Sequence, residues 1–110
     1  MQKVTMNNIG GDVIKDNDVY KLKDNAFGNK LVLSSTFLRA NQNTNGHKHE
    51  GQEEVYMFTK GKGEMIIQEQ GRQECRFKVK KGDIVLIPDG AFHKVINTNH
   101  VGLFFVCVFD

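Results

Sequence analysis

The residues best suited to chemistry are histidines, and three of the four in the chain fall in two short patches. His47 and His49 are separated by one residue, and side chains at positions i and i+2 of a strand point to the same face. Both imidazoles can therefore bind one ion. In the second patch, His93 follows a corner made by Pro88 and Gly90. Because neutral imidazoles are common ligands of metals, the two patches predict one shared site.

A carboxylate close to the first patch would complete this site, and two glutamates compete for the role. Glu54 shares its strand face with Tyr56 and Phe58, which suit a barrel interior, whereas Glu53 points to the opposite face. This alternation favours Glu54 and leaves Glu53 as the alternative. Glu50, in the connecting segment, is expected to be solvated.

Three imidazoles and one carboxylate form a donor set for one divalent transition metal per chain. The set suits iron, manganese, nickel, zinc or copper better than calcium or magnesium, and it does not choose among the five. On a six-coordinate ion, four protein ligands leave about two positions for water or substrate. The predicted site is therefore compatible with catalysis.

The elements that must position these residues are short strands. Glycine, asparagine and aspartate recur so often that most segments are too short for helices, which predicts an all-β chain. A turn is expected at residues 61–63, between two of these strands. The expected strands are 31–40, 53–60, 64–69, 73–79, 84–87, 91–97 and 103–109, with shorter strand-like pieces at 12–14 and 18–22. Short strands joined by tight glycine turns are typical of a sandwich or barrel with meander or Greek-key connections.

The chain is expected to form one domain, because its 110 residues fit a single core. Residues 1–30 are interpreted as edge strands of the same domain, able to cover an edge or to pair with a second copy, and residues 31–110 as the barrel. Cys75 and Cys107 each lie in an expected strand without a CxxC pattern, and both are expected to be small buried hydrophobic residues.

Composition excludes several functional classes. The net charge is +2, with 15 basic and 13 acidic residues dispersed along the chain, which gives no support to nucleic-acid binding. The sequence has neither a membrane-spanning apolar run nor the apolar core of a signal peptide, so no membrane association and a cytoplasmic location are expected. His100, in the turn before the last strand, is expected to face solvent.

The two histidine patches resemble the two motifs of the cupin superfamily, in its small single-domain form. Residues 46–61 (GHKHEGQEEVYMFTKG) are similar to the first motif, whose spacing to its final glycine also favours Glu54. Residues 82–97 are similar to the second, with Gly82, Pro88, Gly90, His93 and Asn97 at the family spacing. One position departs: the glycine often found six residues before the first histidine is Asn41.

This resemblance implies a jelly-roll β-barrel with His47, His49, Glu54 and His93 holding the metal inside it, commonly in a homodimer. It does not fix the reaction. An isomerase or epimerase that acts on a sugar or sugar phosphate is the first expectation. A lyase or dioxygenase that acts on a small carboxylic acid and a barrel that binds metal and a small ligand without catalysis remain alternatives, and a structural role for the metal ranks last.

Three further residues are candidates within the enzyme hypothesis. Tyr56, on the face of Glu54, is a candidate proton donor or acceptor, although a tyrosine packed in the barrel explains it equally simply. Arg39, before the first motif, could bind a carboxylate or phosphate if it points inward, and an exposed arginine is the alternative. Asn97, on the strand face of His93, is the second candidate for substrate binding.

Overall fold

The chain folds entirely into strands and loops, as expected, and the computed structural model describes residues 1–110. The bounds are β1 (Asp12–Asp16), β2 (Tyr20–Asn25), β3 (Val32–Leu38), β4 (Glu54–Lys60), β5 (Lys62–Gln68), β6 (Cys75–Lys80), β7 (Ile84–Ile87), β8 (Phe92–Ile96) and β9 (Leu103–Phe109). Each expected strand and both weaker pieces are confirmed, with ends shifted by a few residues. No helix long and apolar enough to cross a membrane occurs.

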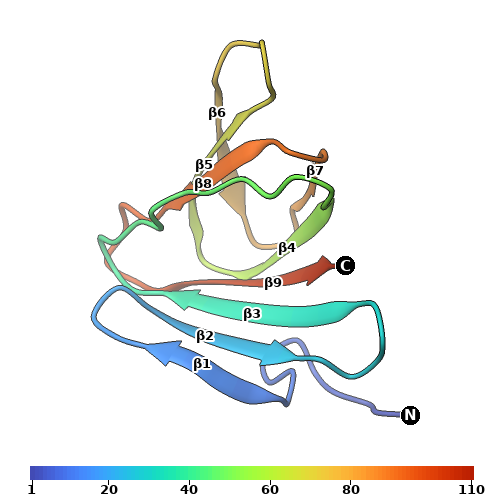
Figure 1. Cartoon of the computed structure of the whole chain (residues 1–110). Helices are drawn as coiled ribbons and strands as arrows, with labels where there is room; N and C mark the ends of the chain where they lie inside the picture. Colours follow the sequence, from blue (N-terminus) through green and yellow to red (C-terminus); the bar gives the residue numbers. More distant parts are fainter.

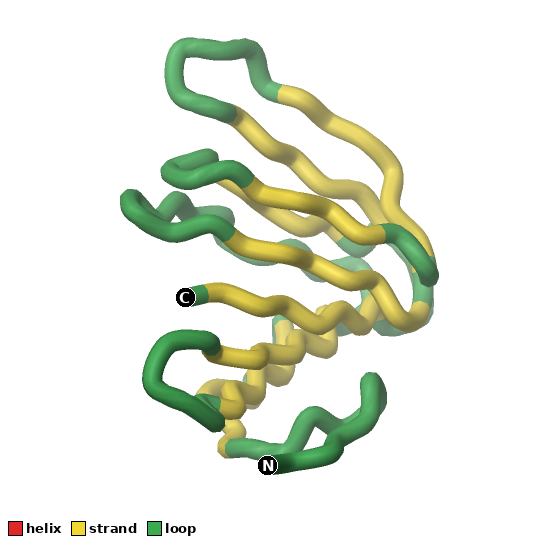
Figure 2. Tube along the Cα trace, turned by 90° about the vertical axis from the view of Figure 1, so that its right-hand side faces the viewer, coloured by secondary structure: helices red, strands yellow, loops and turns green.

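The strands form two antiparallel sheets. The larger has the order β1-β2-β3-β9-β4-β7, and the smaller has the order β6-β5-β8. Figure 1 shows β1, β2, β3, β9 and β4 following one another, with β8, β5 and β6 beyond them. In Figure 2 the connecting loops gather at the ends of the strands. Two facing sheets whose neighbours are often distant in sequence make a jelly-roll barrel.

The core lies between the two sheets and is built from the inward residues of each strand. Alternation in β4 buries Glu54, Tyr56 and Phe58. Across the sheet, Tyr56 is paired with Cys107 and Phe58 with Phe105, so the three aromatic rings pack together in the interior. The apolar cluster consists of Leu38, Tyr56, Phe58, Met65, Val79, Ile87, Ala91, Val95, Leu103, Phe105 and Cys107.

Two expectations need correction. The turn expected at residues 61–63 is shorter, because Gly61 alone adopts a positive φ of 86° and β5 resumes at Lys62. Cys75 is exposed, although it was expected to be buried with Cys107. Cys75 begins β6, which is the edge strand of the smaller sheet and is largely exposed, so strand membership alone did not bury it.

Candidate metal centre

The loop before β4 brings the first histidine patch against β8. His47 and His93 exchange two backbone hydrogen bonds, with N···O distances of 3.0 and 2.9 Å, as an isolated antiparallel bridge. Gly46 precedes this bridge with a φ of 79°, and a Cβ there would lie 2.5 Å from the ring of Phe92. The lack of a side chain at Gly46 therefore lets the loop approach β8 closely enough to deliver His47.

The loop also begins with a left-handed residue. Asn41, which occupies the place of the family glycine, has a φ of 59° and is the only non-glycine residue with a positive φ. Asparagine tolerates this conformation better than most side chains. The departure from the pattern at this position thus leaves a glycine-like backbone conformation in place.

Glu54 enters the centre from the first position of β4. Its side chain is 7% exposed, and its Oε2 lies 3.1 Å from His93 Nε2, whereas Glu53 is exposed. Burial by itself raises the pKa of this carboxyl. The charges that the neighbouring imidazoles of His93, His47 and His49 carry when protonated outweigh burial, so the pKa of Glu54 lies below its usual value. Glu54 is therefore an anion at neutral pH.

The third side chain, His93, is held by one ring nitrogen and leaves the other free. Its Nδ1 lies 3.1 Å from the carbonyl oxygen of Ala91, and because a carbonyl can only accept, Nδ1 carries the proton in the neutral imidazole, which is the form that binds metals. Nε2 then presents a lone pair. This atom is fully buried without a hydrogen bond, although the Glu54 carboxylate is in contact with it. Two hydrogen-bond acceptors in contact are unfavourable in a buried site. A cation bound between them would interact favourably with both.

Three potential ligand atoms are grouped compactly. One nitrogen or oxygen from each of His47, Glu54 and His93 lies within 4.8 Å of the others. The ring of His93 also contacts His47 edge-on, with centroids 4.3 Å apart. His49 lies outside this group of three, but its ring centroid is 4.5 Å from that of His47 and it lines the same cavity. The donor set, two imidazoles and a carboxylate with a third imidazole adjacent, fits a divalent transition metal.

The centre opens into a cavity of about 450 Å³ that is lined by both polar and apolar side chains. Tyr56 lies in this cavity, stacked on Phe105 with ring centroids 5.2 Å apart and edge-on to His93 at 5.6 Å. Burial, together with the neighbouring Cys107 and Glu54, raises the pKa of the Tyr56 hydroxyl well above 10.0. Tyr56 therefore keeps its proton at neutral pH and can donate a hydrogen bond.

The two expected substrate-binding residues do not line this cavity. The guanidinium of Arg39 donates from Nη2 to Asp16, at 2.8 Å, and from Nε to the backbone oxygen of Asn17. The amide of Asn97 is buried and donates to the carbonyl oxygens of Leu38, Arg39 and Val101. Asn97 thus ties the end of β8 to the end of β3, and neither residue reaches the metal centre in this structure.

Sequence reasoning missed some of the residues that do line the cavity. Ser34 and Thr36 of β3 face it from the larger sheet, and Lys15 and Asp24 face it from β1 and β2. Thr36 is paired with Phe105, and Ser34 with Cys107. Alternation within β3 shows that Ser34 and Thr36 share a face, but it does not show that this face lines a cavity. Their pairing with Cys107 and Phe105 of β9 shows it.

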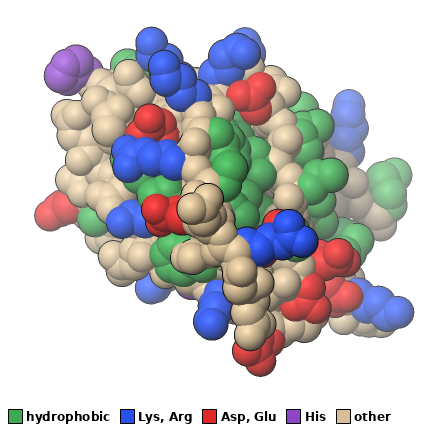
Figure 3. Space-filling model, turned by 90° about the horizontal axis from the view of Figure 1, so that it is seen from above, with side chains coloured by type: hydrophobic (Ala, Val, Ile, Leu, Met, Phe, Trp, Pro, Cys, Tyr) green, Lys and Arg blue, Asp and Glu red, His purple; other side chains and the backbone are tan.

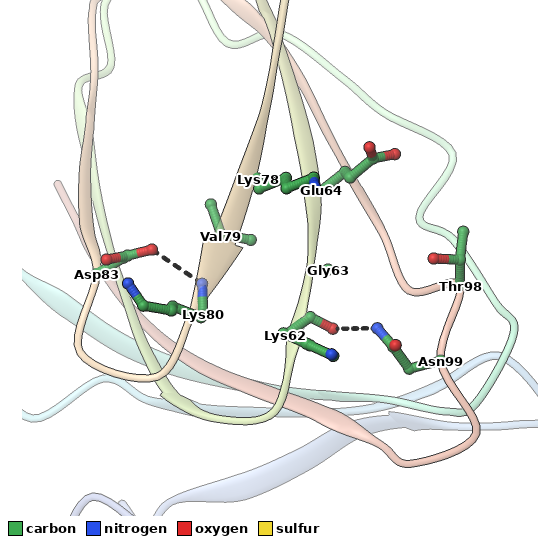
Figure 4. A pocket seen from close by; sticks show the side chains of 9 residues that line it. All are labelled: Lys62, Gly63, Glu64, Lys78, Val79, Lys80, Asp83, Thr98 and Asn99. Carbon is green, nitrogen blue, oxygen red and sulfur yellow. Dashed lines mark hydrogen bonds between the residues drawn. The ribbon is translucent and has the colours of Figure 1, made fainter.

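A second cavity, of about 500 Å³, lies outside the barrel between the β5–β6 hairpin and the loop after β8. Figure 4 shows Lys62, Lys78 and Lys80 along it, with Asn99 donating to the backbone of Lys62 and Asp83 accepting from that of Lys80. It contains no histidine. The face seen in Figure 3 carries basic and acidic side chains interspersed, without a stripe of one sign. The candidate metal-binding residues therefore all lie at the barrel cavity.

The unfolding free energy of the metal-free protein is expected to fall in acid, in part because His47 takes up a proton more readily in the unfolded chain. Burial, followed by the charges of His93 and His49, lowers the pKa of His47 below 6.5. The unfolded chain then binds more protons than the folded chain below that pH, so the unfolding free energy falls as the pH drops below about 6.5. Urea denaturation in EDTA at pH 7.5, 6.5 and 5.5 measures this slope.

The matched variants His47→Gln and His100→Gln separate this effect from general acid sensitivity. His47→Gln should flatten the slope, and His100→Gln, at an exposed turn, should retain it. Equal slopes in the wild type and in His47→Gln would contradict the assignment. The carboxyl of Glu54 adds its own loss of stability only at lower pH, because its folded-state pKa is already below 4.5.

Comparison with known proteins places these features in a family context. Residues 38–109 match the family model described as "Cupin domain". The chain is 34% identical over 80 residues to the uncharacterized protein MJ1618 of Methanocaldococcus jannaschii, a match that covers 73% of this chain and 60% of that protein. It therefore spans less than two thirds of this relative.

Two solved structures share the fold. Oxalate decarboxylase of Bacillus subtilis, which has Mn(II) centres, superimposes with a TM-score of 0.81 at 18% identity, over 89% of this chain and 27% of that chain. The plu4264 protein of Photorhabdus luminescens superimposes with a TM-score of 0.72 at 17% identity, over 99% of this chain and 85% of that chain. These identities establish the fold alone.

Proposed function

The chain belongs to the cupin domain family, and from this premise we propose that it is a metal-dependent isomerase or epimerase that acts on a sugar or a sugar phosphate. The metal would be held by His47, Glu54 and His93, with His49 as the fourth ligand. The observation that carries the proposal is the buried Nε2 of His93, which has no hydrogen bond and faces the Glu54 carboxylate, in a cavity large enough for a small molecule.

The hydroxyl and amide side chains within the cavity lining support a polyhydroxylated substrate. Ser34, Thr36, Thr44 and Gln52 line it, and their side chains can donate to and accept from hydroxyl groups. When bound, a divalent metal would act as a Lewis acid that polarises a substrate carbonyl.

In this proposal Tyr56 is the proton donor, and neighbouring residues hold Tyr56 and His93 in position. Tyr56 keeps its proton, so its hydroxyl can donate to a substrate oxygen on which negative charge develops. The stack of Tyr56 on Phe105 and the neighbouring Phe58 hold the phenol in place. His93 is itself oriented by the carbonyl of Ala91, which keeps the lone pair of Nε2 directed into the centre.

Exchange of substrate hydrogen with solvent tests this proposal directly. Manganese-loaded protein is incubated in D₂O with aldose and ketose phosphates, and NMR measures deuterium incorporation at the carbon next to the carbonyl. Exchange with at least one sugar or sugar phosphate is expected. Tyr56→Phe should lower its rate by about 10- to 100-fold, the lower part of the range for one acid–base or oxyanion-binding group, with unchanged metal content.

Other outcomes would contradict the isomerase. Release of carbon dioxide from oxalate or another small acid, with no exchange on sugars, would instead support a lyase or decarboxylase, the class to which the B. subtilis fold relative belongs. Full exchange in Tyr56→Phe would remove Tyr56 from the mechanism. Metal binding without any turnover would favour a barrel that only binds a small ligand.

A further inference from the structure

An irregularity in the edge strand β1 turns an exposed lysine toward the cavity of the candidate metal centre. Val13 is paired with Lys23 of β2, but Lys15 is paired with Leu22, so Ile14 is the extra residue of a β-bulge. Regular alternation would place Val13 and Lys15 on one face. Because of the bulge, Val13 follows the outer face and Lys15 follows the inner face.

The residues paired with Lys15 across the sheet show that its inner face borders the cavity. Leu22 is paired with Thr36, and Thr36 with Phe105. These three residues and Lys15 all line the 450 Å³ cavity that contains the histidines. The bulge thus places a basic side chain at the β1 side of the metal cavity.

Lys15 is also the only lysine or arginine among the lining residues. The three ion pairs of the structure involve other residues, so its ammonium group has no acidic partner. Asp24 lines the same cavity and Glu54 lies at its far side, so the field at Lys15 is mixed. An unpaired cation in a concave site favours an anionic ligand group, more strongly at low salt.

We propose that Lys15 binds an anionic group at the end of the substrate remote from the metal-binding group, which identifies the substrate as an elongated molecule such as a sugar phosphate. This inference rests on the proposed function. Glu54 is on β4 and Lys15 on β1, and the order β1-β2-β3-β9-β4 puts four strand steps between them. Both residues nevertheless line one cavity, because the long side chain of Lys15 extends from its strand toward the centre, and a two-carbon acid such as oxalate is too short to contact both ends.

Binding measurements with matched probes test the role of Lys15. Isothermal titration of manganese-loaded protein compares glucose 6-phosphate with glucose, ribose 5-phosphate with ribose, and oxalate alone. We expect wild type to bind at least one phosphorylated sugar on the order of five- to tenfold more tightly than its neutral counterpart. Lys15→Gln should abolish this preference, Lys15→Arg should restore most of it, and oxalate affinity should stay the same.

Lys21→Gln is the matched control, because Lys21 lies on the outer face of the same hairpin, opposite Asp16. It should bind every probe as wild type does. The proposal is overturned if Lys15→Gln keeps the phosphate preference, or if wild type shows none. Increased aggregation of Lys15→Gln with an unchanged preference would show that the lysine only protects an edge strand.

The stoichiometry of manganese separates this proposal from the proposed function. Wild type that binds no manganese contradicts the metal-dependent enzyme. Wild type that binds manganese, but shows a phosphate preference that does not depend on Lys15, contradicts only the assignment of Lys15. The titrations repeated in EDTA add a second distinction, since an effect of the Lys15 charge on phosphate should persist without the metal.

Discussion

Replacement of His93 with alanine is expected to lower the affinity for manganese by more than about 100-fold, because it removes the proposed ligand whose Nε2 has no hydrogen-bond partner. Loss of a hydrogen-bond partner behind a metal ligand typically lowers affinity by about 10- to 100-fold, and loss of the ligand itself should exceed this. Nε2 of His93 is the one buried polar side-chain atom without a hydrogen bond. Titration with Mn²⁺ followed by electron paramagnetic resonance measures the change.

Two further variants keep this result interpretable. His100→Ala removes an exposed imidazole in the loop after β8 and should bind manganese as wild type does. Because His93 is 3% exposed, His93→Ala may be compared only if its circular dichroism spectrum is native. If it does not fold, His47→Ala, which lies in a loop and is less buried, should show a similar loss. Wild-type affinity in either folded variant would contradict the metal centre.

The features that were predictable from the sequence lie inside regular strands. In β4, alternation separates Glu54, Tyr56 and Phe58 from Glu53, and the structure buries the first three residues. The i, i+2 relation of His47 and His49 also predicts neighbouring rings, and their centroids are 4.5 Å apart although both residues lie in the loop before β4. Within a regular strand, successive side chains alternate between the two faces, so residue spacing alone predicts which side chains share a face.

Counting fails where a strand ends or bulges. Arg39 follows the last residue of β3, so alternation does not fix its face. Asn97 follows the last residue of β8 and stays buried on the face of His93, but backbone carbonyls take up its amide. Their partners are set by tertiary contacts, such as the pairing of Arg39 with Asp16. The same limit hid Lys15, because no residue type in β1 marks the bulge that turns it inward.

Substitution of Glu54 with glutamine should weaken manganese binding by about 10- to 100-fold, since it removes the anionic member of the donor set while preserving its shape. The same change should leave the metal-free protein as stable as wild type, or more stable by about 1 kcal/mol. The reason is the contact of 3.1 Å between Glu54 Oε2 and His93 Nε2. With a neutral His93 imidazole that contact joins two acceptors, whereas the amide of glutamine can donate to the bare nitrogen.

Glu53→Gln is the matched control for this pair of opposite effects. Glu53 is exposed on the other face of the chain, so its replacement should change neither metal affinity nor the unfolding free energy in EDTA. A Glu54→Gln variant that loses stability without metal would show that the carboxylate contributes to folding through His93. Weakened metal binding in Glu53→Gln, with Glu54→Gln unaffected, would shift the donor set by one residue. If Glu54→Gln weakens metal binding but leaves the metal-free protein as stable as wild type, the carboxylate contributes to cation binding and not to folding. This combination is expected of a buried carboxylate whose role is to bind a cation.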